Sequence, residues 1–288
     1  MPIAFSQQRV NYNTIAHLYD EPFRDHDVDS NLVLYLSEHS YLNPVNLYIL
    51  DTGCGTGKQL LANRKHFPTT PMIGLDIFEG MLRQARKRNK NIAWVQGDSA
   101  TPPFQAASFH YITNQFSYHH IQHKERMFPE IYRLLKPSGR FVMTNIDPWS
   151  MTGWIIYQYF PAAQARDHMD FLHVKEFVEL MEGVGFTNIR VNRNDINVEE
   201  DLYQFLEYAS RRFRASQFMA ISNADYSEGI MKIRNEINKA YGGRILIKSE
   251  VCLVTVTGDK PMCLKQLPQL DKAELDVHTS RLTIDDLG

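Results

Sequence analysis

The sequence predicts an α/β fold in which a largely parallel sheet is covered by helices on both faces. Short apolar runs rich in β-branched and aromatic residues alternate along the chain with longer helical stretches, and this alternation is typical of a doubly wound sheet. Several of these runs end in Asp or Asn, at the carboxyl ends of strands where such sheets bind ligands. With 288 residues, 43% of them hydrophobic, the chain is long enough to bury one sizeable core.

Seven strands are expected in chain order. The predicted ranges are 48–51, 72–76, 92–96, 109–114, 140–146, 188–192 and 250–257, the last ending before Pro261. Asp51, Asp76, Asp98 and Asn114 all follow or end such runs. Because the carboxyl ends of parallel strands meet at one edge, we expect these polar side chains to gather near the point where strand order reverses.

A glycine-rich turn follows the first predicted strand. Gly53, Gly55 and Gly57 allow the backbone to adopt φ > 0 and to approach a ligand closely. Asp76, at the end of the second strand, can accept hydrogen bonds from both hydroxyls of a ribose. The pair predicts a nucleoside cofactor site.

The spacing of the turn separates three kinds of cofactor. A phosphate-binding loop needs four residues between its first glycine and Gly-Lys, whereas only three separate Gly53 from Gly57, and Gln59 stands where Ser or Thr is needed. A dinucleotide site wants a third glycine where this chain has Lys58. Asp51 would repel a pyrophosphate but suits a cationic amino-acid cofactor. A nicotinamide oxidoreductase therefore stays an alternative, although Lys58 in place of the third glycine and the carboxylate of Asp51 both argue against it.

The motifs in order resemble those of class I S-adenosylmethionine-dependent methyltransferases, of the small-molecule type that includes the ubiquinone and menaquinone biosynthesis enzymes. The resemblance covers residues 9–192 and returns near 250–260. It rests on Asp51–Gly57, Asp76-Ile77 with Met81, Gly97-Asp98-Ser99, Asn114–His120, the turn at 134–140 and the helix at 177–186. It implies a Rossmann-like sheet of seven strands whose last strand is antiparallel, and S-adenosyl-L-methionine as the cofactor.

The resemblance also implies roles for single residues. Asp76 and Ile77 would meet the ribose, with Met81 opening the helix behind them. Asp98 and Ser99 would meet the adenine. Asn114 and Gln115 would face the methionine part and the substrate. The remaining cofactor-binding candidates are Tyr19, Asp51, Gly53, Gly55 and Gly57.

Methyl transfer from a sulfonium is an in-line displacement, so the protein mainly aligns the acceptor and excludes water. A hydroxyl or ammonium acceptor needs a base, and His119 and His120, just beyond the fourth strand, are the catalytic candidates. In the resembled family such a pair can also merely shape the pocket. No metal site is predicted, because adjacent histidines rarely reach one ion. Aromatic residues at 149–160 can line an apolar acceptor site or bury a crossover helix.

Four parts of the chain are expected. Residues 1–40 form an N-terminal helical lid that carries Tyr12 and Tyr19 on one face, and 41–192 with 250–261 form the cofactor-binding core. Residues 193–249 form a helical cap insertion over the acceptor, or a dimer contact, and 262–288 a peripheral extension. Three arginines of the insertion, Arg211, Arg212 and Arg214, are interpreted as a solvated face, with an anionic-substrate role as the alternative.

Composition limits the partners. A formal net charge of −2 does not predict a nucleic-acid surface, and no apolar run is long enough for a membrane span. Three cysteines without metal spacing favour a reducing compartment, the cytoplasm by default. The sequence thus predicts methyl transfer to a small, hydrophobic or aromatic metabolite, with a homodimer possible. A non-catalytic cofactor-binding regulator is the other alternative.

Overall fold

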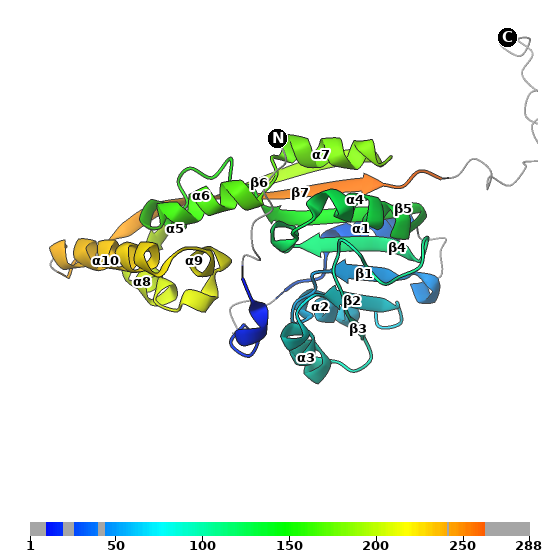
Figure 1. Cartoon of the computed structure of the whole chain (residues 1–288), viewed down its shortest axis with the longest axis horizontal. Coiled ribbons are helices and arrows are strands. Elements are labelled where there is room, and N and C mark those ends of the chain that lie inside the picture. Colours follow the sequence, from blue (N-terminus) through cyan, green and yellow to red (C-terminus); the bar gives the residue numbers. More distant parts are fainter. Residues whose placement is uncertain (1–9, 20–25, 40–43, 241, 263–288) are drawn as a thin grey trace, which may run out of the picture.

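The structure, a computed structural model, describes residues 10–19, 26–39, 44–240 and 242–262 (Figure 1). The first nine residues and nearly all of the expected extension at 262–288 lie outside the described residues. The centre is a seven-stranded sheet in the order β3-β2-β1-β4-β5-β7-β6. This arrangement confirms the predicted α/β, Rossmann-like fold.

Six strands of the sheet run in one direction, and β7 is antiparallel to both of its neighbours, β5 and β6. The strands are β1 (Ile49–Thr52), β2 (Met72–Asp76), β3 (Ala93–Gln96), β4 (Phe109–Gln115), β5 (Leu135–Ile146), β6 (Thr187–Asp201) and β7 (Leu246–Asp259). The chain winds outward from β1 through β2 to β3 and then returns to β4 on the other side of β1. The strand order therefore reverses between β1 and β4, where a ligand site is expected.

Alternate residues of the strands face two separate helical layers. On one face, Ile49 and Tyr111 pack with α1 (Ser30–Glu38), α2 (Lys58–His66) and α3 (Glu79–Arg88). On the other, Leu50 and Ile112 pack with α4 (Lys124–Leu134) and α7 (Val174–Gly183). Burial of both faces explains why β1 is apolar at nearly every position up to Asp51.

The last two strands are longer than the sequence indicated. Predicted at 188–192 and 250–257, they pair with each other as far as Asp201 and Leu246, beyond the point where β7 leaves β5. Residues 193–201 and 246–249, expected within the helical insertion, are therefore strand. The side chains of β6 are mostly exposed, so its sequence lacks the apolar alternation of a half-buried strand. The length of the strand could therefore not be predicted from its sequence.

The end of this β6–β7 ribbon carries a second hydrophobic core. It joins α5 (Ile155–Tyr159) and α6 (Pro161–Asp170) to α8 (Leu202–Ala209), α9 (Ser216–Ala220) and α10 (Asn223–Lys239). Figure 1 shows these helices grouped at the far end of the ribbon from α4 and α7. The division into a core and a cap stays a prediction, and the helical part of the insertion begins at Leu202.

The described N-terminal residues differ from the expected helical lid. Tyr12–Thr14 forms a short 3-10 helix, η1, and turns continue to Tyr19. Asn11 caps η1, since its side chain accepts a hydrogen bond from Asn13 N at 3.1 Å. Further along, α1 packs in the sheet's helical layer with Leu32 and Tyr35 buried. Three other 3-10 helices are η2 (Pro44–Asn46), η3 (Tyr118–His120) and η4 (Arg212–Arg214).

Candidate active site

A cavity of about 580 Å³ opens at the carboxyl ends of β1, β2 and β4, where the strand order reverses. Twelve of the fourteen residues predicted for the site line it. They are Tyr19, Asp51, Gly53, Gly55, Asp76, Ile77, Met81, Asp98, Ser99, Gln115, His119 and His120. The two others, Gly57 and Asn114, are not among its lining residues.

The glycine turn brings backbone against the cavity. Gly53 has φ 73°, and a Cβ there would lie 2.1 Å from Ser117 Oγ. Gly55 has φ 55° and donates its N–H to Asp76 Oδ2 at 2.8 Å. Gly57, at φ 79°, is the N-cap of α2, and a Cβ would meet the Trp94 ring at 2.3 Å. Gly57 is therefore required by the packing of the turn on β3 rather than by the cavity wall.

Asn114 is fully buried and holds the end of β1. Its Nδ2 donates to Thr52 O at 2.9 Å and lies 3.2 Å from Thr52 Oγ1. Ser117 Oγ also donates to Thr52 O, at 3.1 Å. The Asn114 side chain bridges the neighbouring strands β1 and β4 through its Nδ2, and its role toward cofactor or substrate stays a prediction.

Asp76 is held in place by two backbone donors. Its Oδ2 accepts from Gly55 N and its Oδ1 from Phe78 N, both at 2.8 Å. Burial raises the pKa of this carboxyl to about 6, against the lowering effect of the two backbone hydrogen bonds. Each oxygen keeps a further lone pair, so the geometry allows Asp76 to accept from a vicinal diol.

Asp51 is a buried carboxyl in the same cavity. Burial raises its pKa well above the ordinary value, and the negative charges of Asp29 and Asp76 raise it further. Asp29 in turn accepts a hydrogen bond from Tyr111 Oη at 2.7 Å. A cationic group placed beside Asp51 would relieve this repulsion, which is the property expected of a residue that binds an ammonium group.

The two candidate bases are held differently. The amide of Asn145 is oriented by Ile146 N, which donates to its Oδ1 at 2.9 Å, so its Nδ2 faces His119 Nδ1 at 3.1 Å. His119 Nδ1 must therefore accept, which occupies the basic lone pair of the neutral ring. His119 Nε2 is covered from solvent, and the ring stacks on Phe171 at 4.4 Å. This geometry argues against His119 as the base and leaves His120 as the stronger candidate.

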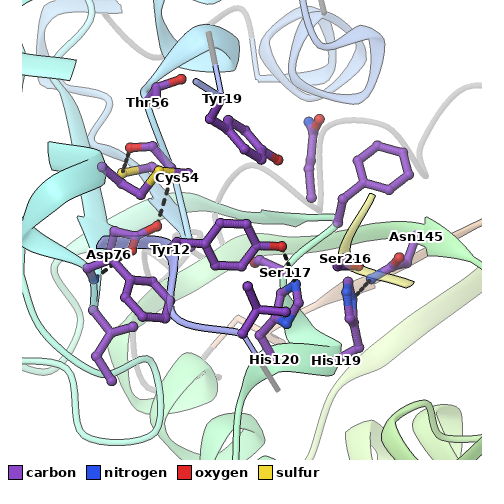
Figure 2. Close-up of a pocket in the computed structure, with 18 of the residues that line it drawn as sticks. Tyr12, Tyr19, Cys54, Thr56, Asp76, Ser117, His119, His120, Asn145 and Ser216 are labelled. Atoms are coloured by element: carbon purple, nitrogen blue, oxygen red, sulfur yellow. Dashed lines mark hydrogen bonds between the residues drawn. The ribbon is translucent and has the colours of Figure 1, made fainter. Parts of the chain in front are cut away.

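His120 is bonded to the N-terminal segment. Tyr12 Oη lies 3.0 Å from His120 Nε2, and the two rings meet edge to face. Figure 2 shows Tyr12 extending between Asp76 on one side and the two histidines on the other. The segment is held there by Asn13, whose Oδ1 accepts from Gly80 N at 2.7 Å. Tyr12 thus links the carboxylate side of the cavity to its histidine side.

Sequence reasoning missed one part of the wall and placed another only broadly. His26 lines the cavity and its Nδ1 lies 3.0 Å from Gln59 Oε1, which ties the segment before α1 to α2. The inserted helical region contributes Tyr208, Phe213, Arg214, Ala215, Ser216 and Gln217. No signal in the sequence indicated which turn of this region faces the cavity, because the β6–β7 ribbon that carries it was underestimated.

The aromatic stretch after β5 divides between two roles. Trp154 lines the cavity. Tyr157, Tyr159 and Phe160 are buried in the second core, as the core-packing interpretation expected. Within the described ranges, no group of three or more His, Cys, Asp or Glu side chains could hold a metal ion.

A family profile matches the part of the chain that forms the cofactor side of the cavity. A family profile described as "Methyltransferase domain" matches residues 49–139, which contain the glycine turn, Asp76 and the histidine pair. Residues 49–139 therefore match a methyltransferase domain, in agreement with the resemblance to the class I S-adenosylmethionine-dependent methyltransferases. The matched residues include all fourteen predicted site residues except Tyr19.

Relatives by sequence are similar over part of their length. The biotin biosynthesis bifunctional protein BioHC of Teredinibacter turnerae is 29% identical over 188 residues, 62% of this chain and 30% of that protein. Demethylmenaquinone methyltransferase of Lactococcus lactis is 28% identical over 152 residues, 48% of this chain and 60% of that protein. The chain thus spans less than two thirds of these relatives.

Solved structures share the fold. A phosphoethanolamine N-methyltransferase 2 of Haemonchus contortus, in complex with phosphomonomethylethanolamine and S-adenosylhomocysteine, matches with a TM-score of 0.56 and 19% identity. The match covers 89% of this chain and 61% of that one. None of the described helices of the present chain combines the length and the apolar character needed to cross a membrane.

Proposed function

We propose that this protein transfers a methyl group from S-adenosylmethionine to a small-molecule acceptor by in-line displacement. The observation that carries the proposal is one continuous cavity with two kinds of wall. One wall is the glycine turn with the Asp76 carboxylate, which accepts from two backbone N–H groups, and the His120–Tyr12 pair faces it from the β4 side.

The described residues fit the cofactor. Asp76 has acceptor capacity for two ribose hydroxyls beyond its two backbone bonds, and Ile77, 46% exposed next to it, offers an apolar surface at the cavity. Asp98 and Ser99 lie beyond β3, where the adenine is expected. Asp51 would bind the amino-acid ammonium. The bound cofactor supplies an electrophilic methyl group, so no covalent protein intermediate is needed.

The protein's own contribution is alignment and proton transfer. The wall of Phe116, Trp154 and Phe213 excludes water from the acceptor side of the cavity. His120 Nε2 takes the acceptor's proton once the acceptor replaces Tyr12 Oη as the hydrogen-bond partner of that nitrogen. His119, locked by Asn145, shapes the floor beside it.

The apolar wall supports an acceptor with a hydrophobic or aromatic body. Phe116 is 44% exposed at the cavity and adopts φ 52°, an unfavourable backbone for a non-glycine residue. Such strain is found where a side chain's position matters to function. Cytoplasmic location, a homodimer and the absence of a nucleic-acid partner stay predictions.

Methyl-labelled S-adenosylmethionine and a fractionated small-molecule extract test the proposal. Wild-type protein is expected to move the label into a non-protein fraction. His120→Ala should slow this transfer about 10²- to 10⁴-fold, as for loss of a general base. Tyr12→Phe should slow it less, because the ring that spans the cavity remains.

The matched control is His123→Ala, a half-exposed histidine three residues on, near Glu125, which should transfer label normally. Cofactor binding with no label transfer to any fraction would instead support the non-catalytic regulator.

A further inference from the structure

The inserted helical region places an arginine at the acceptor side of the cavity. Arg214, the last residue of η4, lines the cavity together with its neighbours Phe213 and Gln217. The turn is fixed from two sides. Tyr208 Oη donates to Arg214 O at 3.2 Å, and Gln217 Nε2 donates to the buried Asp167 Oδ2 at 3.0 Å. These hydrogen bonds hold this wall of the cavity in a defined position.

The three arginines of this turn differ in what they contact. Arg211 is 46% exposed and pairs with Glu207 at 3.6 Å, one helical turn away. Arg212 ties the turn together, since it donates to Phe218 O, Ile221 O and Asn223 Oδ1 and covers the Tyr226 ring. Of the three, only Arg214 lines the cavity, with its guanidinium 5.6 Å from the centre of the Tyr208 ring.

The lining carboxyls of the cavity all lie on one side, which also carries Lys58. The lining carboxyls Asp51, Asp76 and Asp98 belong to β1, β2 and the turn after β3, on the cofactor side. The lining residues that come from the end of β5 and from the inserted region are Asn145, Ile146, Tyr208, Phe213, Arg214, Ala215, Ser216 and Gln217. The formal charge of this second group is positive. A guanidinium is well suited to the planar pair of oxygens of a carboxylate or to a phosphate.

We infer that the acceptor carries an anionic group beside its apolar body, and that Arg214 binds this group. The inference rests on the proposed function, because it names the class of molecule that the same cavity would accept. The apolar body faces Phe116, Trp154 and Phe213, and the acid group faces Arg214. Carboxylates and phosphates share this chemistry. The sequence left two interpretations of the three arginines, a solvated face or a site for an anionic substrate. The second interpretation then applies to Arg214 alone.

Two fluorescent probes with one ring system test the inference without knowledge of the acceptor. 1-Anilinonaphthalene-8-sulfonate is anionic, and N-phenyl-1-naphthylamine is the same skeleton without the sulfonate. Each is titrated into protein saturated with S-adenosylhomocysteine. The anionic probe is expected to bind wild-type protein more tightly than the neutral one. Arg214→Gln should weaken the anionic probe at least tenfold, as for a charge-assisted hydrogen bond, and leave the neutral probe within twofold.

Arg211→Gln is the matched control, a nearby arginine outside the cavity, and should leave both probes unchanged. Arg214→Lys, which keeps the charge, should restore most of the anionic probe's affinity. In wild-type protein, raising NaCl from about 50 to about 500 mM should weaken the anionic probe more than the neutral one, since salt screens charge. This last comparison needs no variant, so a folding defect in Arg214→Gln cannot hide the answer.

Anionic-probe affinity that neither Arg214→Gln nor salt changes would overturn the inference, as would equal affinity for the two probes. Calorimetric binding of S-adenosylhomocysteine separates this failure from that of the proposed function. Wild-type protein that binds S-adenosylhomocysteine but shows no charge preference contradicts the role of Arg214 only. Wild-type protein that does not bind S-adenosylhomocysteine contradicts the proposed function.

Discussion

At the scale of single residues, Asp76 supports the glycine turn and is the proposed ligand of the cofactor's ribose. It already satisfies the N–H groups of Gly55 and Phe78, so its replacement removes both a ligand contact and a support of the turn. Asp76→Ala is expected to weaken S-adenosylhomocysteine binding by about 2–4 kcal/mol, measured by calorimetry. Asp195→Ala, an exposed carboxyl on β6 outside the cavity, is the control. Unchanged affinity in Asp76→Ala would remove Asp76 from the ribose site.

The raised pKa of Asp76 predicts a pH dependence with a definite sign. Its folded-state pKa is about 6, above the ordinary 3.8 of an unfolded chain. Between these values the folded state holds more protons, so the contribution of Asp76 to the free energy of unfolding falls as pH rises from about 4 to 6. As pH rises over this interval, the free energy of unfolding of wild type should therefore fall relative to that of Asp76→Asn. Denaturant unfolding of the two proteins at several pH values measures this difference.

Cofactor binding should show the opposite trend. Only the ionised carboxylate accepts from two hydroxyls, so affinity for S-adenosylhomocysteine should fall as pH drops below about 6, by up to tenfold per unit. In Asp76→Asn this part of the pH dependence should vanish. A wild-type affinity that stays flat from pH 7 to pH 5 would contradict the assignment.

At the scale of elements, the turn between β1 and α2 depends on close approach as well as on backbone conformation. Gly53→Ala places a Cβ at positive φ and 2.1 Å from Ser117 Oγ. Gly242→Ala, in the turn before β7, has a similar φ of 84° with nothing within 4 Å. The control should cost about 1 kcal/mol of stability from backbone strain alone. Gly53→Ala should cost clearly more and weaken cofactor binding; equal losses in denaturant unfolding would contradict the close approach.

The β6–β7 ribbon shows where element prediction from sequence fails. The strands of the parallel core could be predicted closely, because burial on both faces makes them apolar runs such as Met72–Asp76, which is observed with the same bounds. The outer half of β6 is polar and exposed. Its pairing partner, Leu246 to Ser249, is about fifty residues away in the chain. Strand structure set by such distant pairing leaves little local signal.

Some residues of the candidate site could likewise be predicted from local sequence, and others could not. Asp51, Asp76 and the glycines could be found because their chemistry demands those residue types at the ends of strands. Asn114 stays a predicted site residue, but its side chain turns toward β1 through hydrogen bonds that no spacing reveals. The relative roles of His119 and His120 depend on partners at long range, Asn145 and Tyr12. Arg214 reaches the cavity only through the ribbon, so its position followed from the structure alone.

At the scale of the whole molecule, two cores meet around one cavity. The sheet with α1–α4 and α7 supplies the carboxyls, the histidines and Phe116, and the region at the end of the ribbon supplies Trp154, Phe213 and Arg214. A ligand that contacts both cores should stabilise them together, because it binds the folded state only. We therefore expect the ligand to raise the unfolding temperature of both cores together.

Thermal unfolding with S-adenosylhomocysteine, with NADH and without ligand tests the cofactor assignment most directly. A ligand at about a hundred times its dissociation constant adds roughly 2.7 kcal/mol, which raises the midpoint of a chain of this size by several degrees. We expect such a rise with S-adenosylhomocysteine and none with NADH, because Lys58 replaces the third glycine and Asp51 repels a pyrophosphate. A rise with NADH alone would contradict the methyltransferase assignment of this cavity.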